Sequence, residues 1–103
     1  MSIPEGWINP ITSEPGQVQH DVDPVSLRPG RSDLVKVRLE WQRHLLTHGI
    51  PRFTPIQVNQ DAIINDGHHA IRAAAEEGRS VDVLIIGGNL IAVDETILEL
   101  PVE

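Results

Sequence analysis

The sequence predicts a single α+β domain in which two main helices flank a small mixed sheet. The length of 103 residues suits one modest hydrophobic core. Two stretches with helical periodicity alternate with short apolar stretches typical of strands, and residues 81–86 are almost continuously apolar. We expect an irregular N-terminal arm over residues 1–23 and the folded domain over residues 24–103.

The N-terminal arm contains several prolines and glycines and shows little periodicity, which is typical of irregular structure. We expect Trp7 and Ile8 to anchor it onto the core. Val25-Ser26-Leu27 follows as a short expected strand, because the turn sequence Arg28-Pro29-Gly30 closes it.

The first helix is expected from about Ser32 to Thr47, with Ser32 as its N-cap and Gly49 as its end. Its apolar residues project as two stripes, which favours a helix packed on two sides. One stripe consists of Leu34, Val37, Trp41 and Leu45, and the other of Val35, Leu39 and Leu46.

Residues 55–65 have the pattern of a β-hairpin, with strands at Ile56-Gln57-Val58 and Ala62-Ile63-Ile64. An alanine-rich helix is expected from about Gly67 to residue 77, with Asp66 as its N-cap and Gly78 as its end. The apolar strand at residues 81–86 comes next, and we expect a returning strand at Leu90-Ile91-Ala92-Val93.

The composition excludes several classes of function. The formal charge is −7 and the pI is about 5.1, whereas proteins that bind duplex DNA through its phosphates usually carry a positive charge. The absence of cysteine excludes disulfides, thiolate catalysis and cysteine-based zinc sites. No stretch reaches the ~18 apolar residues of a membrane span, and no signal-peptide pattern is evident. We therefore expect a soluble cytoplasmic domain without a membrane partner, either independent or part of a longer protein.

The most informative run is Asp66-Gly67-His68-His69, which joins an apolar strand to the alanine-rich helix. The first N–H groups of a helix lack intrahelical partners, and the helix dipole is positive there, so this position favours anions. Gly67 lets a ligand approach the backbone closely. Arg72 lies four residues after His68 on the same helix face, so a phosphate here would meet N–H groups, imidazoles and a guanidinium. Two polar rings at a tight turn have little packing value, which favours a functional role for both.

Together with its neighbouring segments, this run resembles the ParB/sulfiredoxin-like superfamily over roughly residues 24–88. Gly67, Arg72 and Ala73 match the nucleotide motif of ParB partition proteins, and Gly67 and His69 match the sulfiredoxin motif. His68 occupies the position of the sulfiredoxin cysteine, so the chain is not a true sulfiredoxin. The other segments that carry the resemblance are Val25–Pro29, Pro55–Asp61, Arg72–Gly78 and Val81–Ile86.

The resemblance implies a site that binds a phosphate ligand, either a nucleotide or a nucleic-acid phosphodiester, together with phosphoryl transfer or hydrolysis as in a ParB-like nuclease or toxin module. His68, His69 and Asp66 are the expected catalytic residues. Gly67, His68, His69 and Arg72 are expected to bind a nucleoside triphosphate or diphosphate with Mg²⁺, and Asp66 is either a cap or a Mg²⁺ ligand. The metal requirement stays open.

Other interpretations remain open. Ala70 replaces an arginine of the family motif, which favours a non-catalytic module that binds a nucleotide or a protein partner. A homodimer is a separate open possibility. Arg72 is also explained as a surface partner of Glu76. His44 and His48 have metal-ligand spacing on the first helix, but no third ligand is evident nearby, so we interpret them as a solvated or half-buried pair.

Overall fold

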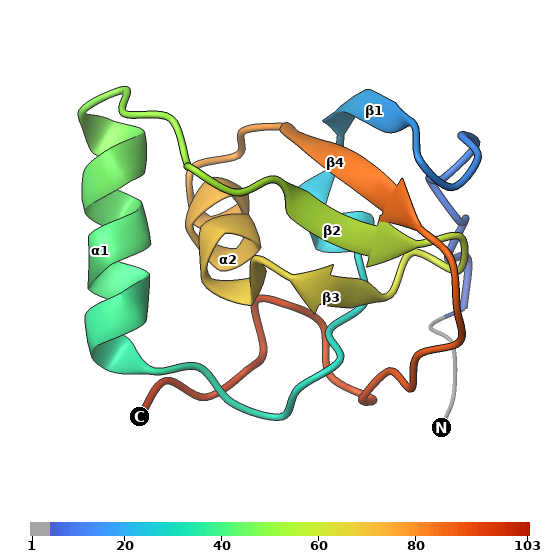
Figure 1. Cartoon of the computed structure of the whole chain (residues 1–103). Helices are drawn as coiled ribbons and strands as arrows, with labels where there is room; N and C mark the ends of the chain where they lie inside the picture. Colours follow the sequence, from blue (N-terminus) through green and yellow to red (C-terminus); the bar gives the residue numbers. More distant parts are fainter. Residues whose placement is uncertain (1–4) are drawn as a thin grey trace.

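The chain forms an α+β fold with a four-stranded mixed sheet and two α-helices, and the computed structural model describes residues 5–103 (Figure 1). The strand order is β1–β4–β2–β3, so the expected class and the mixed sheet are confirmed. No helix within residues 5–103 combines the length and the apolar character needed to cross a bilayer. The elements are β1 (Val18–Val22), the 3₁₀ turn η1 (Pro24–Ser26), α1 (Lys36–Thr47), β2 (Ile56–Asn59), β3 (Ile64–Asp66), α2 (His68–Glu76) and β4 (Val81–Ile86).

The centre of the sheet is the parallel pair β2 and β4. Ile56 of β2 pairs with Val83 of β4, and Val58 pairs with Ile85. These four residues are all buried, whereas the residues that alternate with them on β4 are exposed or half-buried, so the apolar run is covered fully on one face only. β1 and β3 are antiparallel edge strands, so the expected hairpin between β2 and β3 is confirmed, although its second strand begins at Ile64 rather than at Ala62.

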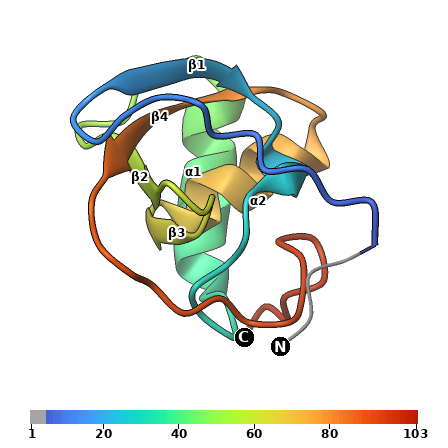
Figure 2. The same ribbon diagram turned by 90° about the vertical axis from the view of Figure 1, so that its right-hand side faces the viewer.

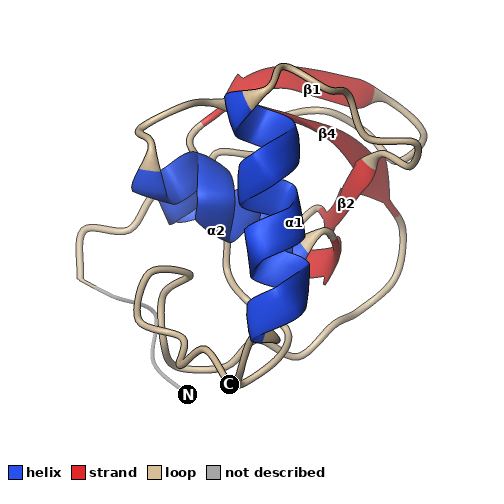
Figure 3. Cartoon of the chain, turned by 90° about the vertical axis from the view of Figure 1, so that its left-hand side faces the viewer, coloured by secondary structure: helices blue, strands red, loops and turns tan. Residues whose placement is uncertain are grey.

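The core lies between the sheet and α2, which runs along one side of the sheet (Figure 2). Ile71, Ala74 and Ala75 of α2 belong to the same buried cluster as Val58 and Val83. Small alanine side chains allow the helix backbone to approach the strands closely. α1 packs against α2 near the end of the sheet where β2 and β4 begin (Figures 1 and 3).

The prediction of an irregular arm is wrong over Val18–Val22, which form strand β1 against β4. The sequence of this strand is mostly polar and only Val22 is buried. It therefore lacks the alternation of apolar and polar residues that would have identified it as a strand. Trp7 does anchor the arm, since its Nε1–H donates to the Ser26 carbonyl at 3.0 Å. Ile8, the second expected anchor, is 81% exposed. Residues 1–4 of the arm lie outside the described residues.

Two of the other expected strands are absent from the described chain. Val25-Ser26-Leu27 is replaced by η1, because Pro24 favours the first position of a helical turn and the Asp23 carboxylate accepts the Val25 N–H at 3.0 Å. The segment 90–93 leaves the sheet. Its hydrogen bond to the rest of the fold runs from the Val93 N–H to the Pro29 carbonyl, at 2.9 Å.

The first helix begins later than expected, at Lys36, with Val35 rather than Ser32 as its N-cap. Ser32 instead lies in a bend and Val35 has an extended backbone, and between them Leu34 forms a bridge with Val102 near the chain's C-terminal end. The prediction of two packed stripes is also wrong, because Val37 and Trp41 are 69% and 56% exposed.

Candidate functional site

The turn between β3 and α2 is the centre of the candidate site. Gly67 follows the last residue of β3 with a φ of 101°, and α2 begins at His68. A Cβ at Gly67 would lie 3.0 Å from Ile56 Cγ1, and this left-handed backbone is strained for any other residue. Gly67 is the N-cap and no side chain caps the helix, so the prediction of an Asp66 cap is wrong. The glycine backbone alone makes the sharp turn.

Both imidazoles are bonded into the fold. His68 Nε2 accepts the Gly30 N–H at 2.9 Å, and His69 Nε2 accepts the Val35 N–H at the same distance. The two side chains are buried, at 8% and 9% exposure. The expectation that these rings have little packing value is therefore wrong, since both are buried and hold the loop at residues 30–35 against α2. Because each Nε2 is an acceptor, the ring proton sits on Nδ1.

The surroundings keep both rings neutral at physiological pH. Burial, with a smaller effect of the Arg31 charge, lowers the pKa of His68 to about 4. Burial is also the main cause that lowers the pKa of His69, followed by the charges of Arg31, Arg38 and Arg52. A neutral imidazole is the form that accepts the two N–H groups, so the pKa shifts and the hydrogen bonds agree.

An open cleft of about 610 Å³ lies over the start of α2. The first hydrogen bond of this helix runs from the Ile71 N–H to the Gly67 carbonyl, so within residues 5–103 the N–H groups of His68, His69 and Ala70 have no partner. These groups and the helix dipole favour an anion. The cleft is lined by Gly30, Arg31, Arg38, Ile64, Asn65, Asp66, Gly67, His68, His69, Asn89, Leu90 and Ile91.

Asp66 lines the same cleft, with 55% of its side chain exposed. Its carboxylate Oδ2 lies 3.8 Å from Arg52 Nη2. Asp66, Gly67, His68 and His69, the consecutive residues of the motif, all line this one cleft.

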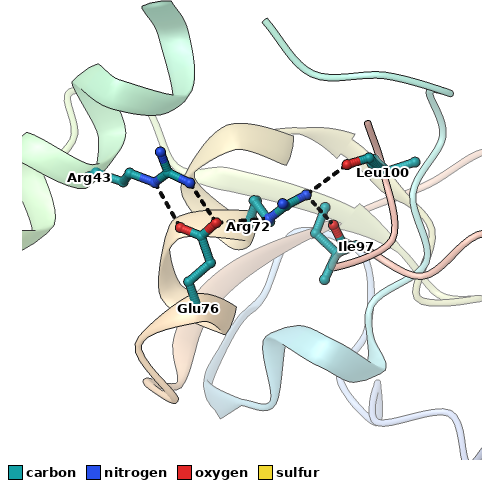
Figure 4. A network of polar contacts seen from close by, with 5 residues as sticks. All are labelled: Arg43, Arg72, Glu76, Ile97 and Leu100. Atoms are coloured by element: carbon teal, nitrogen blue, oxygen red, sulfur yellow. Dashed lines mark hydrogen bonds and ion pairs between the residues drawn. The ribbon is translucent and has the colours of Figure 1, made fainter. Parts of the chain in front are cut away.

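Arg72 is not part of this arrangement, because its side chain points toward the C-terminal segment (Figure 4). Its Nη1 donates to the carbonyls of Ile97 and Leu100 at 3.2 and 2.9 Å, and its Nε donates to Glu76 at 3.0 Å. Glu76 also holds Arg43 of α1 through two bonds of 2.8 and 2.7 Å. Arg72 thus joins α2 to the C-terminal segment, while its partner Glu76 joins α2 to α1. The expected contact of Arg72 with a ligand has no support from its position.

The cations beside the cleft come from elsewhere in the chain. Arg31 and Arg38 line it, and Arg52 lies beside Asp66. Arg31 Nε donates to the Asp33 carbonyl at 2.6 Å, while Arg38 makes no hydrogen bond or ion pair with any described residue. Sequence reasoning missed Arg38 and Arg52 because both are about fifteen to thirty residues from the motif, and no local pattern marks them.

Among the described residues, no three His, Asp or Glu side chains come close enough to hold a metal ion. Asp66 as a Mg²⁺ ligand thus stays a prediction that needs ligand oxygens from a bound phosphate.

Comparisons with protein-family models, with curated proteins and with solved structures gave no match.

Proposed function

We propose that this chain is a ParB/sulfiredoxin-like domain that binds a phosphate-bearing ligand, a nucleotide or a phosphodiester, in the cleft over the start of α2. The observation that carries the proposal is the joint presence of unpaired helix N–H groups and two arginines, Arg31 and Arg38, around one open cleft. Such a set of donors suits the oxygens of a phosphate.

The charges around the cleft favour the binding of an anion, although the net charge of the whole chain is negative. The formal charge is −7, yet three of the eight basic residues act on His69 from around this corner. Asp66 is the acidic residue that lines the cleft, and it lies near Arg52. A cleft with a locally positive potential attracts anionic ligands even when the whole protein repels them.

The imidazoles favour binding over acid–base catalysis. Both Nε2 atoms already accept backbone N–H groups, and the pKa of His68 is lowered to about 4, so neither ring is placed to donate a proton at neutral pH. In this proposal His68 and His69 are positioning residues that hold the loop with Arg31 beside the helix start. The non-catalytic form of the function is therefore the one that we favour. Phosphoryl transfer or hydrolysis with Asp66 as a base or Mg²⁺ ligand stays a prediction.

The test is a thermal shift measured with ATP, CTP, ADP and inorganic phosphate, each with and without Mg²⁺. A ligand at 100 times its Kd stabilises the fold by about 2.7 kcal/mol, which raises Tm by about 10 °C or more for a domain of this size. Arg38→Ala should remove most of this shift, because Arg38 lines the cleft and has no ion pair to lose in the described chain. Arg79→Ala, at an exposed arginine outside the cleft, is the matched control and should keep the full shift.

An equal shift in the wild type and in Arg38→Ala would refute the proposed cleft, and no shift with any phosphate ligand would refute the function. Release of phosphate or cleavage of a nucleic acid that Asp66→Asn abolishes would add a reaction to the site.

A further inference from the structure

The second feature of interest is a pair of exposed histidines at the C-terminal end of α1, outside the cleft: His44 lies in the helix and His48 is its C-cap. His44 and His48 lie one helical turn apart, and their ring centroids are 4.1 Å apart with an angle of 36° between the planes. Two imidazoles at i and i+4 on one helix face are a known arrangement for binding a transition-metal ion. The rings are therefore already adjacent before any ligand binds.

The hydrogen bond of His48 prepares it for coordination. Its Nδ1 lies 2.9 Å from the His44 carbonyl, and since a carbonyl only accepts, Nδ1 carries the proton and Nε2 keeps a free lone pair. Metal-binding histidines usually donate their other N–H to a carbonyl or carboxylate in this way. His44 is also held in place, because its ring stacks on Trp41 with centroids 5.5 Å apart.

The other histidines of the chain do not offer such a pair. His68 and His69 are buried acceptors of backbone N–H groups, and His20 contacts Asp82 at 3.2 Å on the far edge of the sheet. The chain contains five histidines and no cysteine, so His44 and His48 are its best two ligands for a borderline metal ion.

We propose that His44 and His48 bind Zn²⁺ and that a second copy of the chain supplies the same two ligands, so that the metal links two chains through α1. Zn²⁺ in stable protein sites takes four ligands in a tetrahedron, and the described residues of one chain offer no third His, Asp or Glu at this position. A twofold axis through the metal doubles two ligands to four, and homodimers most often have this symmetry.

The surface around the histidines suits contact with another copy. Val37 and Trp41 lie on the same face of α1 and are 69% and 56% exposed, and Phe53 in the loop after α1 is fully exposed. Trp41 and Phe53 line one shallow depression. Exposed apolar side chains of this size beside a ligand pair are typical of a protein contact, and a metal-linked pair of chains shields them from water.

The experiment uses the untagged chain, titrated with ZnCl₂ and followed by calorimetry and by sedimentation velocity. The expected result is one Zn²⁺ per two chains, a mass that rises from 11.4 kDa to about twice that value, and reversal by EDTA. The tryptophan fluorescence should change with the same midpoint, because Trp41 stacks on a ligand. His48→Ala should abolish both binding and the mass change, and circular dichroism should show an intact fold because this side chain is exposed.

His20→Ala is the matched control, since it removes an exposed histidine outside the pair and should leave the dimer unchanged. Binding of one Zn²⁺ per chain without a change in mass would overturn the shared site. A zinc-dependent dimer that survives His48→Ala would overturn the assignment of the ligands, and the absence of any zinc binding would overturn the whole inference.

Discussion

Acidification is expected to destabilise this fold through the buried histidines at the start of α2. His68 is 8% exposed, and its Nε2 accepts the Gly30 N–H at 2.9 Å. Burial, assisted by the Arg31 charge, lowers the pKa of His68 to about 4 from the usual 6.5. The unfolded chain therefore takes up a proton at a higher pH than the folded chain does. A histidine with a lowered pKa contributes its full stability above the unfolded pKa, and this contribution is lost as the pH falls below about 6.5.

The size of the loss follows from the two pKa values. Between pH 7.5 and pH 5 the free energy of unfolding should fall by about 2 kcal/mol from His68 alone, and His69 adds to the loss because its pKa is lowered too. Glu76 contributes little to the change in stability over this pH range, because its pKa lies below the ordinary value of 4.5. The hydrogen bond from Arg43 to its carboxylate is the main cause of that lowered pKa. Against a total stability of about 5–15 kcal/mol, a change of this size is easily measured.

The assay is urea unfolding followed by tryptophan fluorescence at pH 7.5 and pH 5, on the wild type and on His68→Gln. The glutamine amide oxygen reaches close to the position of Nε2 and does not titrate, so the variant should lose about 2 kcal/mol less on acidification. At pH 7.5 the variant itself should be less stable by about 1 kcal/mol, because the hydrogen bond to Gly30 is less well aligned. His44→Gln controls for the loss of one imidazole as such. Parallel pH dependence in the wild type and in His68→Gln would refute the assignment of the proton uptake to His68.

Two further predictions concern the supports of the site. Gly67→Ala should destabilise the fold by about 2 kcal/mol, because φ is 101° and the new Cβ would lie 3.0 Å from Ile56. Gly49→Ala, with a φ of 66° and open space around it, should cost less, and equal urea midpoints for the two variants would contradict the steric argument. Glu76→Gln should cost about 1 kcal/mol at pH 7, since this carboxylate holds Arg43 and a second arginine. The difference from the wild type should shrink as the pH falls below 4.5 and vanish below the lowered pKa that Glu76 has in the folded chain, because the carboxylate is then protonated. A difference that persists there would show that charge is not its cause.

The elements that the sequence predicts well are those that nearby residues determine. Helix α2 follows from its alanines, β4 from a continuous apolar run, and the sharp turn between β3 and α2 from Gly67. β1 escapes this reasoning because its residues are mostly polar and exposed, and pairing with β4 alone makes it a strand. The late start of α1 has the same origin, since the extended residues before it are held by contacts with distant parts of the chain.

The same distinction between local and long-range contacts applies to the candidate site. The sequence locates the turn, the two imidazoles and the cleft-facing carboxylate, but it does not show which atoms face each Nε2. The two acceptors bond to N–H groups 38 and 34 residues away, at Gly30 and Val35, and only the tertiary structure brings these groups to α2. These two hydrogen bonds change the role that we assign to His68 and His69. Because His68 and His69 are kept neutral, they do not contribute a charge to an anion, and the positive potential must come from the helix start and from Arg31 and Arg38. Anion binding here should therefore depend on arginines that lie outside the motif, whereas the motif's histidines determine whether the loop that carries Arg31 stays in place.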